Sequence, residues 1–68
     1  MQIDPQKLRA EMNKNGFSIS EFKRQSGIKN QTIERALNGK VKNQHSATVF
    51  KMCAALGVKP EDILKLDD

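Results

Sequence analysis

Residues 18–39 read SISEFKRQSGIKNQTIERALNG, and this stretch decides the fold. Ser18 followed three residues later by Glu21 is the pattern of a capping box, in which both residues satisfy backbone groups at a helix start. Apolar residues then recur at helical spacing up to Gly27, and glycine readily takes the left-handed conformation that ends a helix. The first half of the stretch therefore predicts a helix over residues 19–25 and a turn at Gly27.

The second half of the stretch predicts another short helix, over about residues 30–38. Ile33, Ala36 and Leu37 form its apolar stripe, and Gly39 ends it. Two helices of about two turns each, joined by a glycine turn of three or four residues, form a helix-turn-helix.

Three further helices are predicted on either side. Asp4 followed by Pro5 suits a helix start, because aspartate caps a helix and proline is tolerated at its first position. Ser46 is expected to cap a later helix, and Pro60 lies near the start of the last one. The five predicted helices cover about residues 5–15, 19–25, 30–38, 46–56 and 61–66. The fold class predicted is all-α, a compact five-helix bundle, with residues 1–68 as a single domain.

The apolar stripes of these helices predict a small core. Its expected members are Ile3, Leu8, Met12, Phe17, Phe22, Ile28, Ile33, Ala36, Leu37, Val49, Met52, Cys53, Leu56, Ile63, Leu64 and Leu66. Phe50 lies off the inward stripe of its helix. It either fills an irregular edge of the core or contacts a second copy of the chain together with Val58.

Charge is unevenly placed along the chain. The net charge is +4, but residues 1–60 hold eleven Lys and Arg against four acids, and four acids gather in residues 61–68. A basic surface of this kind suits a polyanion, with ordinary solubilising charge as the alternative. The single cysteine and the lack of a signal peptide or a long apolar run predict an intracellular protein without a membrane span, and the initial methionine suggests a complete small protein.

No arrangement of residues predicts catalysis or a metal site. His45 is a lone histidine without a cysteine or acid at ligand spacing, and Cys53 lies on a buried stripe, where a packed thiol is expected. No Ser-His-acid arrangement or glycine-rich phosphate loop is visible. We therefore expect a protein that is not an enzyme and uses no cofactor, metal or small-molecule ligand.

With these landmarks in place, the sequence resembles the helix-turn-helix domains of phage repressors and Cro proteins, the lambda-repressor-like or XRE type. The resemblance covers about residues 6–66. The matching segments are Gly16-Phe17-Ser18, Gly27, Ile33, Asn38-Gly39-Lys40, Ala55-Leu56-Gly57-Val58 and Asp62-Ile63-Leu64. It implies a DNA-binding domain that acts as a transcriptional repressor on an operator, commonly as a homodimer on a pseudo-palindromic site in double-stranded DNA. It also implies a cytoplasmic, nucleoid-associated location in a bacterial or phage-infected cell.

The sequence departs from the family pattern in three ways, which involve four positions. Ile19 stands where the family usually has a phosphate-contacting glutamine, and Lys23 where it usually has a small residue. Met12 and Leu37 occupy two positions where many members have an arginine and a glutamate. An ion pair has thus been exchanged for a predicted hydrophobic contact, which can be neutral or stabilising.

The resemblance places the helix over residues 30–38 in the major groove, with its polar residues toward base edges. The candidate base-reading residues are Asn30, Gln31, Thr32, Glu34, Arg35 and Asn38. The Arg35 guanidinium can donate two hydrogen bonds to guanine O6 and N7, and the Asn30 and Gln31 amides match N6 and N7 of adenine. Glu34 either accepts a hydrogen bond from cytosine N4 or, as we favour, orients Arg35 or another basic neighbour. The alternative for the first three is a solvated polar turn in which Asn30 or Lys29 is the cap.

Flanking residues are expected to contact phosphates. They are Ser18, Ser20, Lys23, Lys29, Lys40, Lys42 and Asn43. Each lysine could instead be an ordinary solvated charge. Two other functions remain open: a protein-interaction module, antitoxin-like or anti-repressor, and a non-specific nucleic-acid binder.

Overall fold

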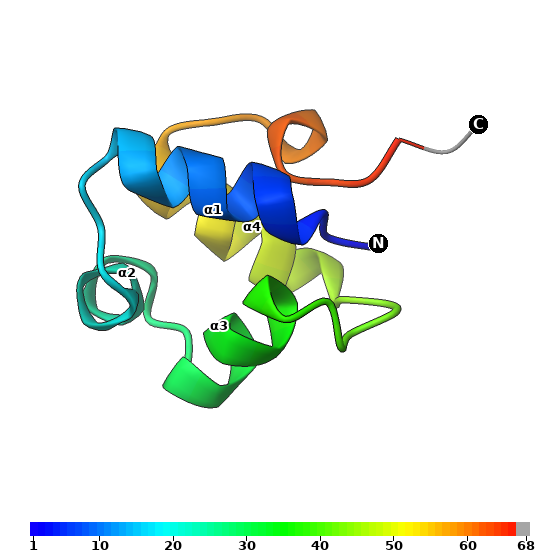
Figure 1. Ribbon diagram of the computed structural model, residues 1–68, viewed down its shortest axis with the longest axis horizontal. Coiled ribbons are helices and arrows are strands. Elements are labelled where there is room, and N and C mark those ends of the chain that lie inside the picture. The colour runs from blue at the N-terminus through cyan, green and yellow to red at the C-terminus, as the bar shows by residue number, and fades with distance from the viewer. Residues whose placement is uncertain (67–68) are drawn as a thin grey trace.

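The computed structural model describes residues 1–66, which form four α-helices and one 3-10 turn (Figure 1). The elements are α1 (Pro5–Lys14), α2 (Ile19–Ser26), α3 (Asn30–Leu37), α4 (Ser46–Leu56) and η1 (Pro60–Asp62). α2 packs against α3 and α4, and α1 packs against α3. The all-α prediction is confirmed, and each of these four helices starts within one residue of its predicted position.

Polar side chains fix the first two helix starts. The Asp4 carboxylate accepts a hydrogen bond from the backbone N–H of Gln6 at 3.0 Å. Ser18 Oγ accepts one from the backbone N–H of Glu21 at 3.1 Å. The predicted capping box is only half formed, because the Glu21 carboxylate instead accepts a hydrogen bond from a side chain one turn further along α2. The predicted cap at Ser46 is wrong by one residue: the extended backbone of His45 precedes α4, and Ser46 is its first residue.

The fifth helix was predicted wrongly. Within the described residues, the segment after Pro60 makes a single 3-10 turn and then becomes extended. It forms an antiparallel bridge between Ile3 and Leu64, with backbone hydrogen bonds of 2.8 and 2.9 Å on either side. This pairing uses backbone groups that a helix would need, and it leaves Leu66 73% exposed instead of in the core. The N-terminal and C-terminal segments therefore lie together at one end of the molecule (Figure 1).

Most of the predicted core is confirmed. The buried apolar residues are Ile3, Leu8, Met12, Phe22, Ile28, Ile33, Ala36, Leu37, Val49, Met52, Cys53, Leu56 and Ile63. Phe17 and Leu64 are only partly buried against them. The Phe17 ring stacks on Phe22 with centroids 6.1 Å apart, so the residue before the Ser18 cap packs against the first turns of α2 as in a hydrophobic staple. Gln44 is a buried polar residue that the sequence did not predict, and its Oε1 has no hydrogen-bond partner within residues 1–66.

The turn between α2 and α3 is held by a short set of hydrogen bonds. Ser26 Oγ donates to the carbonyl of Phe22 at 2.6 Å and accepts the N–H of Ile28 at 3.2 Å. Gly27 lies between them with φ 73°, in the left-handed region. Because Ile28 is buried just after this turn, the turn both ends α2 and anchors the start of α3.

We expect Gly27→Ala to lower the melting temperature. A Cβ at Gly27 would meet no atom within 4 Å, so the cost comes from placing alanine in the left-handed region, about 1 kcal/mol. For a domain of this size, that loss corresponds to roughly 4–8 °C in thermal unfolding followed by circular dichroism. Gly27→Asn is the control, because asparagine tolerates this conformation better. An unchanged melting temperature in the alanine variant would contradict the role given to this turn.

Candidate nucleic-acid interface

The exposed face of α3 carries the predicted base-reading residues. Ile33, Ala36 and Leu37 are buried against the other helices, so the opposite side of α3 faces solvent. Five of the six candidates are exposed and one, Thr32, is half-buried. The exposed ones are Asn30, Gln31, Glu34, Arg35 and Asn38. The structure thus brings most of the predicted set onto one accessible face.

These side chains form no hydrogen bond or ion pair with another side chain within residues 1–66. Lys29 occupies the cap position of α3 without a side-chain hydrogen bond, and Asn30 is already the first helical residue. The alternative that Asn30 serves as a cap is therefore wrong. No Glu34–Arg35 ion pair forms in this part of the chain, so the orienting role of Glu34 stays a prediction for the DNA-bound form. The amide and guanidinium groups of α3 are available to an external ligand.

All seven predicted phosphate contacts are exposed. They are Ser18, Ser20, Lys23, Lys29, Lys40, Lys42 and Asn43. Ser18 Oγ already accepts a backbone N–H as the cap of α2, and its hydroxyl hydrogen can still be donated. The segment between α3 and α4 is fixed at its far end, because the Asn43 side-chain oxygen accepts a hydrogen bond from the amine of Met1. The two lysines of this segment are thus carried by a loop tied to the N-terminus.

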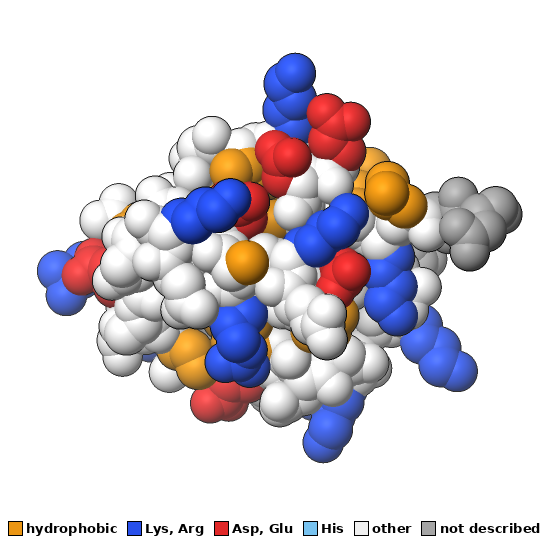
Figure 2. Space-filling model, turned by 45° about the horizontal axis from the view of Figure 1, so that its top comes forward, with side chains coloured by type: hydrophobic (Ala, Val, Ile, Leu, Met, Phe, Trp, Pro, Cys, Tyr) orange, Lys and Arg blue, Asp and Glu red, His pale blue; other side chains and the backbone are white. Residues whose placement is uncertain are grey.

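Basic side chains are spread over the surface, and some are already paired. On the face in Figure 2, Lys and Arg side chains alternate with acidic and neutral ones, so they form no continuous patch there. Lys14 lies 3.5 Å from Glu11, and Arg24 lies 3.8 Å from Glu21. The end of the acidic segment, Asp67 and Asp68, lies outside the described residues. The distribution of charge on this face therefore does not locate a nucleic-acid interface. The exposed polar residues of α3 locate the candidate interface instead.

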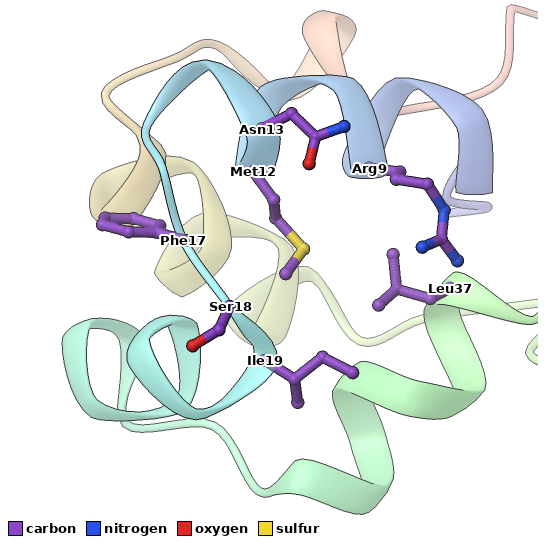
Figure 3. A pocket seen from close by; sticks show the side chains of 7 residues that line it. All are labelled: Arg9, Met12, Asn13, Phe17, Ser18, Ile19 and Leu37. Carbon is purple, nitrogen blue, oxygen red and sulfur yellow. The ribbon is translucent and has the colours of Figure 1, made fainter.

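A cavity of about 180 Å³ lies between α1, the start of α2 and the end of α3 (Figure 3). Its lining residues are Arg9, Met12, Asn13, Phe17, Ser18, Ile19 and Leu37. Met12 and Leu37 are 4% and 8% exposed, so both of these positions, where the resemblance implied an ion pair, are buried and apolar here. Arg9 and Asn13 were not among the predicted site residues, because only the packing of α1 against α3 brings them to this cavity.

Phe50 is a large exposed apolar residue on α4. It is 54% exposed, so the alternative that it fills an edge of the core is wrong. Val58 is partly buried and packs against the core. The contact of either residue with a second copy stays a prediction.

The acidic, histidine and cysteine side chains of the described residues bear on metal binding and thiol reactivity. No group of three or more His, Cys, Asp or Glu side chains in residues 1–66 could hold a metal ion. Burial, and secondly the nearby Asp62 carboxylate, raise the pKa of the Cys53 thiol, which disfavours a reactive thiolate. None of the described helices has the length and apolar character needed to cross a membrane.

Comparison with known proteins gives one family and several similar structures. The model for the Cro/C1-type HTH DNA-binding domain matches residues 7–68. No curated protein matches the chain. A mutant of hydroxyethylphosphonate dioxygenase is similar over 100% of this chain, with TM-score 0.85 and 24% identity, but the match spans only 14% of that protein.

Two smaller proteins are similar over most of their own length. The restriction-modification controller protein C.AhdI from Aeromonas hydrophila has TM-score 0.76 and 22% identity, covering 85% of this chain and 86% of that one. The hypothetical transcription factor NHTF from Neisseria has TM-score 0.73 and 24% identity, covering 91% and 78%. At these identities the structural similarity supports the fold alone, and the family match carries the assignment.

Proposed function

The chain belongs to the Cro/C1-type helix-turn-helix DNA-binding family, and from this premise we propose that it is a transcriptional repressor that occupies a specific operator. The exposed polar face of α3 carries the proposal, because its side chains have no side-chain partner within residues 1–66 and match the groups exposed in the major groove. Arg35 reads guanine, and Gln31 and Asn30 read adenine. It acts in the cytoplasm of a bacterial or phage-infected cell.

The operator is a pseudo-palindrome bound by two copies of the chain. Two-fold symmetric proteins of this kind read half-sites about one helical turn apart. Phe50 is the residue best suited to the contact between copies, since a large exposed aromatic side chain gains most from burial. Val58 and the segment after η1 complete that contact.

Two proteins with similar structures carry the names of regulators, a restriction-modification controller protein and a hypothetical transcription factor, so a regulatory role is in keeping with the shared fold. The rival functions are a protein-interaction module and a non-specific nucleic-acid binder.

A salt titration separates these possibilities. We expect affinity for duplex DNA to fall steeply as salt rises, because phosphate contacts release counterions, and to stay higher for one sequence than for random duplex at every salt concentration. Equal affinity for all sequences would leave only non-specific binding. An absence of salt-dependent DNA binding would favour the protein-interaction module.

Lys42→Ala should weaken binding to specific and random duplexes by the same factor. Lys42 is exposed in the loop after α3, where a lysine contacts phosphate and carries no sequence information. The slope of log affinity against log salt should become smaller by about 1 for each bound copy of the chain. Lys59→Ala, beside η1, is the control and should leave the slope unchanged. A loss confined to one sequence would contradict the phosphate role.

A further inference from the structure

The cavity beside α3 combines an apolar floor with one cation. Met12 and Leu37 are almost completely buried at its base, and Ile19 adds a partly exposed side chain. Figure 3 shows Arg9 reaching from α1 toward Leu37, across the space between the two helices. The lining residues include no acid. The cavity is therefore apolar inside and positive at its rim.

Arg9 is not engaged elsewhere in the described chain. It is exposed, and none of the ion pairs or side-chain hydrogen bonds within residues 1–66 involves its guanidinium. An arginine can rest its aliphatic stem on apolar surface and keep its weakly hydrated guanidinium available for a phosphate. Ser18 and Asn13 add neutral polar groups to the same rim. This arrangement suits a ligand with an anionic group next to an apolar one.

The position of the cavity identifies that ligand. It opens between the start of α2 and the end of α3, so it lies beside the helix proposed to enter the major groove. A sugar–phosphate backbone borders that groove, and each of its units joins a phosphate to a largely apolar deoxyribose. The volume of about 180 Å³ is below the usual range for small-molecule pockets, which favours a partly inserted backbone unit over an enclosed ligand.

We propose that this cavity seats one sugar–phosphate unit of the DNA backbone, with Arg9 paired to the phosphate and the deoxyribose against Ile19 and Leu37. The inference rests on the proposed DNA-binding function and extends the interface from the helix-turn-helix to α1. It also gives Ile19 a role: an apolar residue here packs against the sugar, while the charge comes from Arg9.

The first test compares Arg9→Met with Arg24→Met. Arg24 is an exposed arginine at the other end of α2 and does not line the cavity, so it is the matched control. Arg9→Met should weaken binding roughly three- to tenfold on every duplex, as loss of one exposed charge-assisted contact does. It should reduce the salt slope by about 0.9 for each bound copy of the chain, the value for one phosphate, while Arg9→Lys keeps the slope. Circular dichroism should show unchanged thermal unfolding, because Arg9 is exposed.

The second test replaces single phosphates of the bound duplex by uncharged methylphosphonates. At one position in each half-site, replacing the phosphate should weaken binding of the unmodified protein. The same replacement should cause no further loss of affinity in Arg9→Met, but it should still weaken binding of Lys42→Ala. An unchanged salt slope together with equal sensitivity at every linkage would overturn the proposal. A change in oligomeric state with an unchanged slope would also overturn it, because it would assign the cavity to a second copy.

These tests separate the inference from the function it rests on. The salt slope can be measured on random duplex as well as on a preferred sequence. A smaller slope for Arg9→Met without any sequence preference would support the backbone contact and refute the repressor. A preferred DNA sequence together with an unchanged salt slope for Arg9→Met would support the repressor and refute the backbone contact.

Discussion

Phe22→Ala is expected to remove about a third or more of the free energy of unfolding. Phe22 is 0% exposed, and α2, which carries it, packs against both α3 and α4. Truncating a buried phenylalanine costs about 3–5 kcal/mol. A folded chain of 68 residues has only about 3–10 kcal/mol of stability in total. The loss should appear in urea unfolding curves followed by circular dichroism as a much lower midpoint.

Phe50→Ala is the matched control for Phe22. It removes the same side chain from a site that is 54% exposed, so a change within about 0.5 kcal/mol is expected. The comparison should be repeated at two protein concentrations, because a dimer contact through Phe50 would make stability depend on concentration. A Phe22→Ala protein as stable as Phe50→Ala would show that the core is arranged differently.

Arg35→Ala is expected to lower affinity for the preferred sequence by about 1–3 kcal/mol and to relax one position of the site. Arg35 is exposed on α3, and its bidentate geometry matches guanine O6 and N7. Binding measured by fluorescence anisotropy on the preferred duplex and on variants changed at single positions should show discrimination lost at one guanine. Random duplex should be affected much less.

Arg24→Ala serves as the control for Arg35. Arg24 lies on α2 and pairs with Glu21, so its loss should change no base preference. If Arg35→Ala weakens preferred and random duplexes equally, Arg35 contacts phosphate and does not read a base.

The sequence predicted the helix-turn-helix well because its signals are local. The Ser18 cap and Gly27 act within their own helical turns, and the apolar spacing of α3 sets which side is buried. The last helix was mispredicted because its conformation depends on a distant segment. Leu64 pairs with Ile3, and no pattern within residues 61–66 reveals that partner.

In the candidate site, too, features set by local sequence could be predicted and features set by distant contacts could not. The polar face of α3 could be predicted, because helical periodicity alone separates Arg35 from the buried Leu37. The cavity at Arg9 could not, because it needs the packing of α1 against α3. Gln44 was missed for a similar reason: it belongs to a polar loop by composition, and its burial accompanies a backbone hydrogen bond to Met1, which is distant in the sequence.

Selection of bound duplexes from a random pool, followed by sequencing, tests the central claim most directly. The repressor proposal predicts enrichment of an inverted repeat with half-sites about ten base pairs apart. Loss of that enrichment in Arg35→Ala, with retention in Arg24→Ala, would tie it to α3. Salt-sensitive retention of every sequence without enrichment would contradict the proposal, because it would leave only electrostatic binding to the backbone.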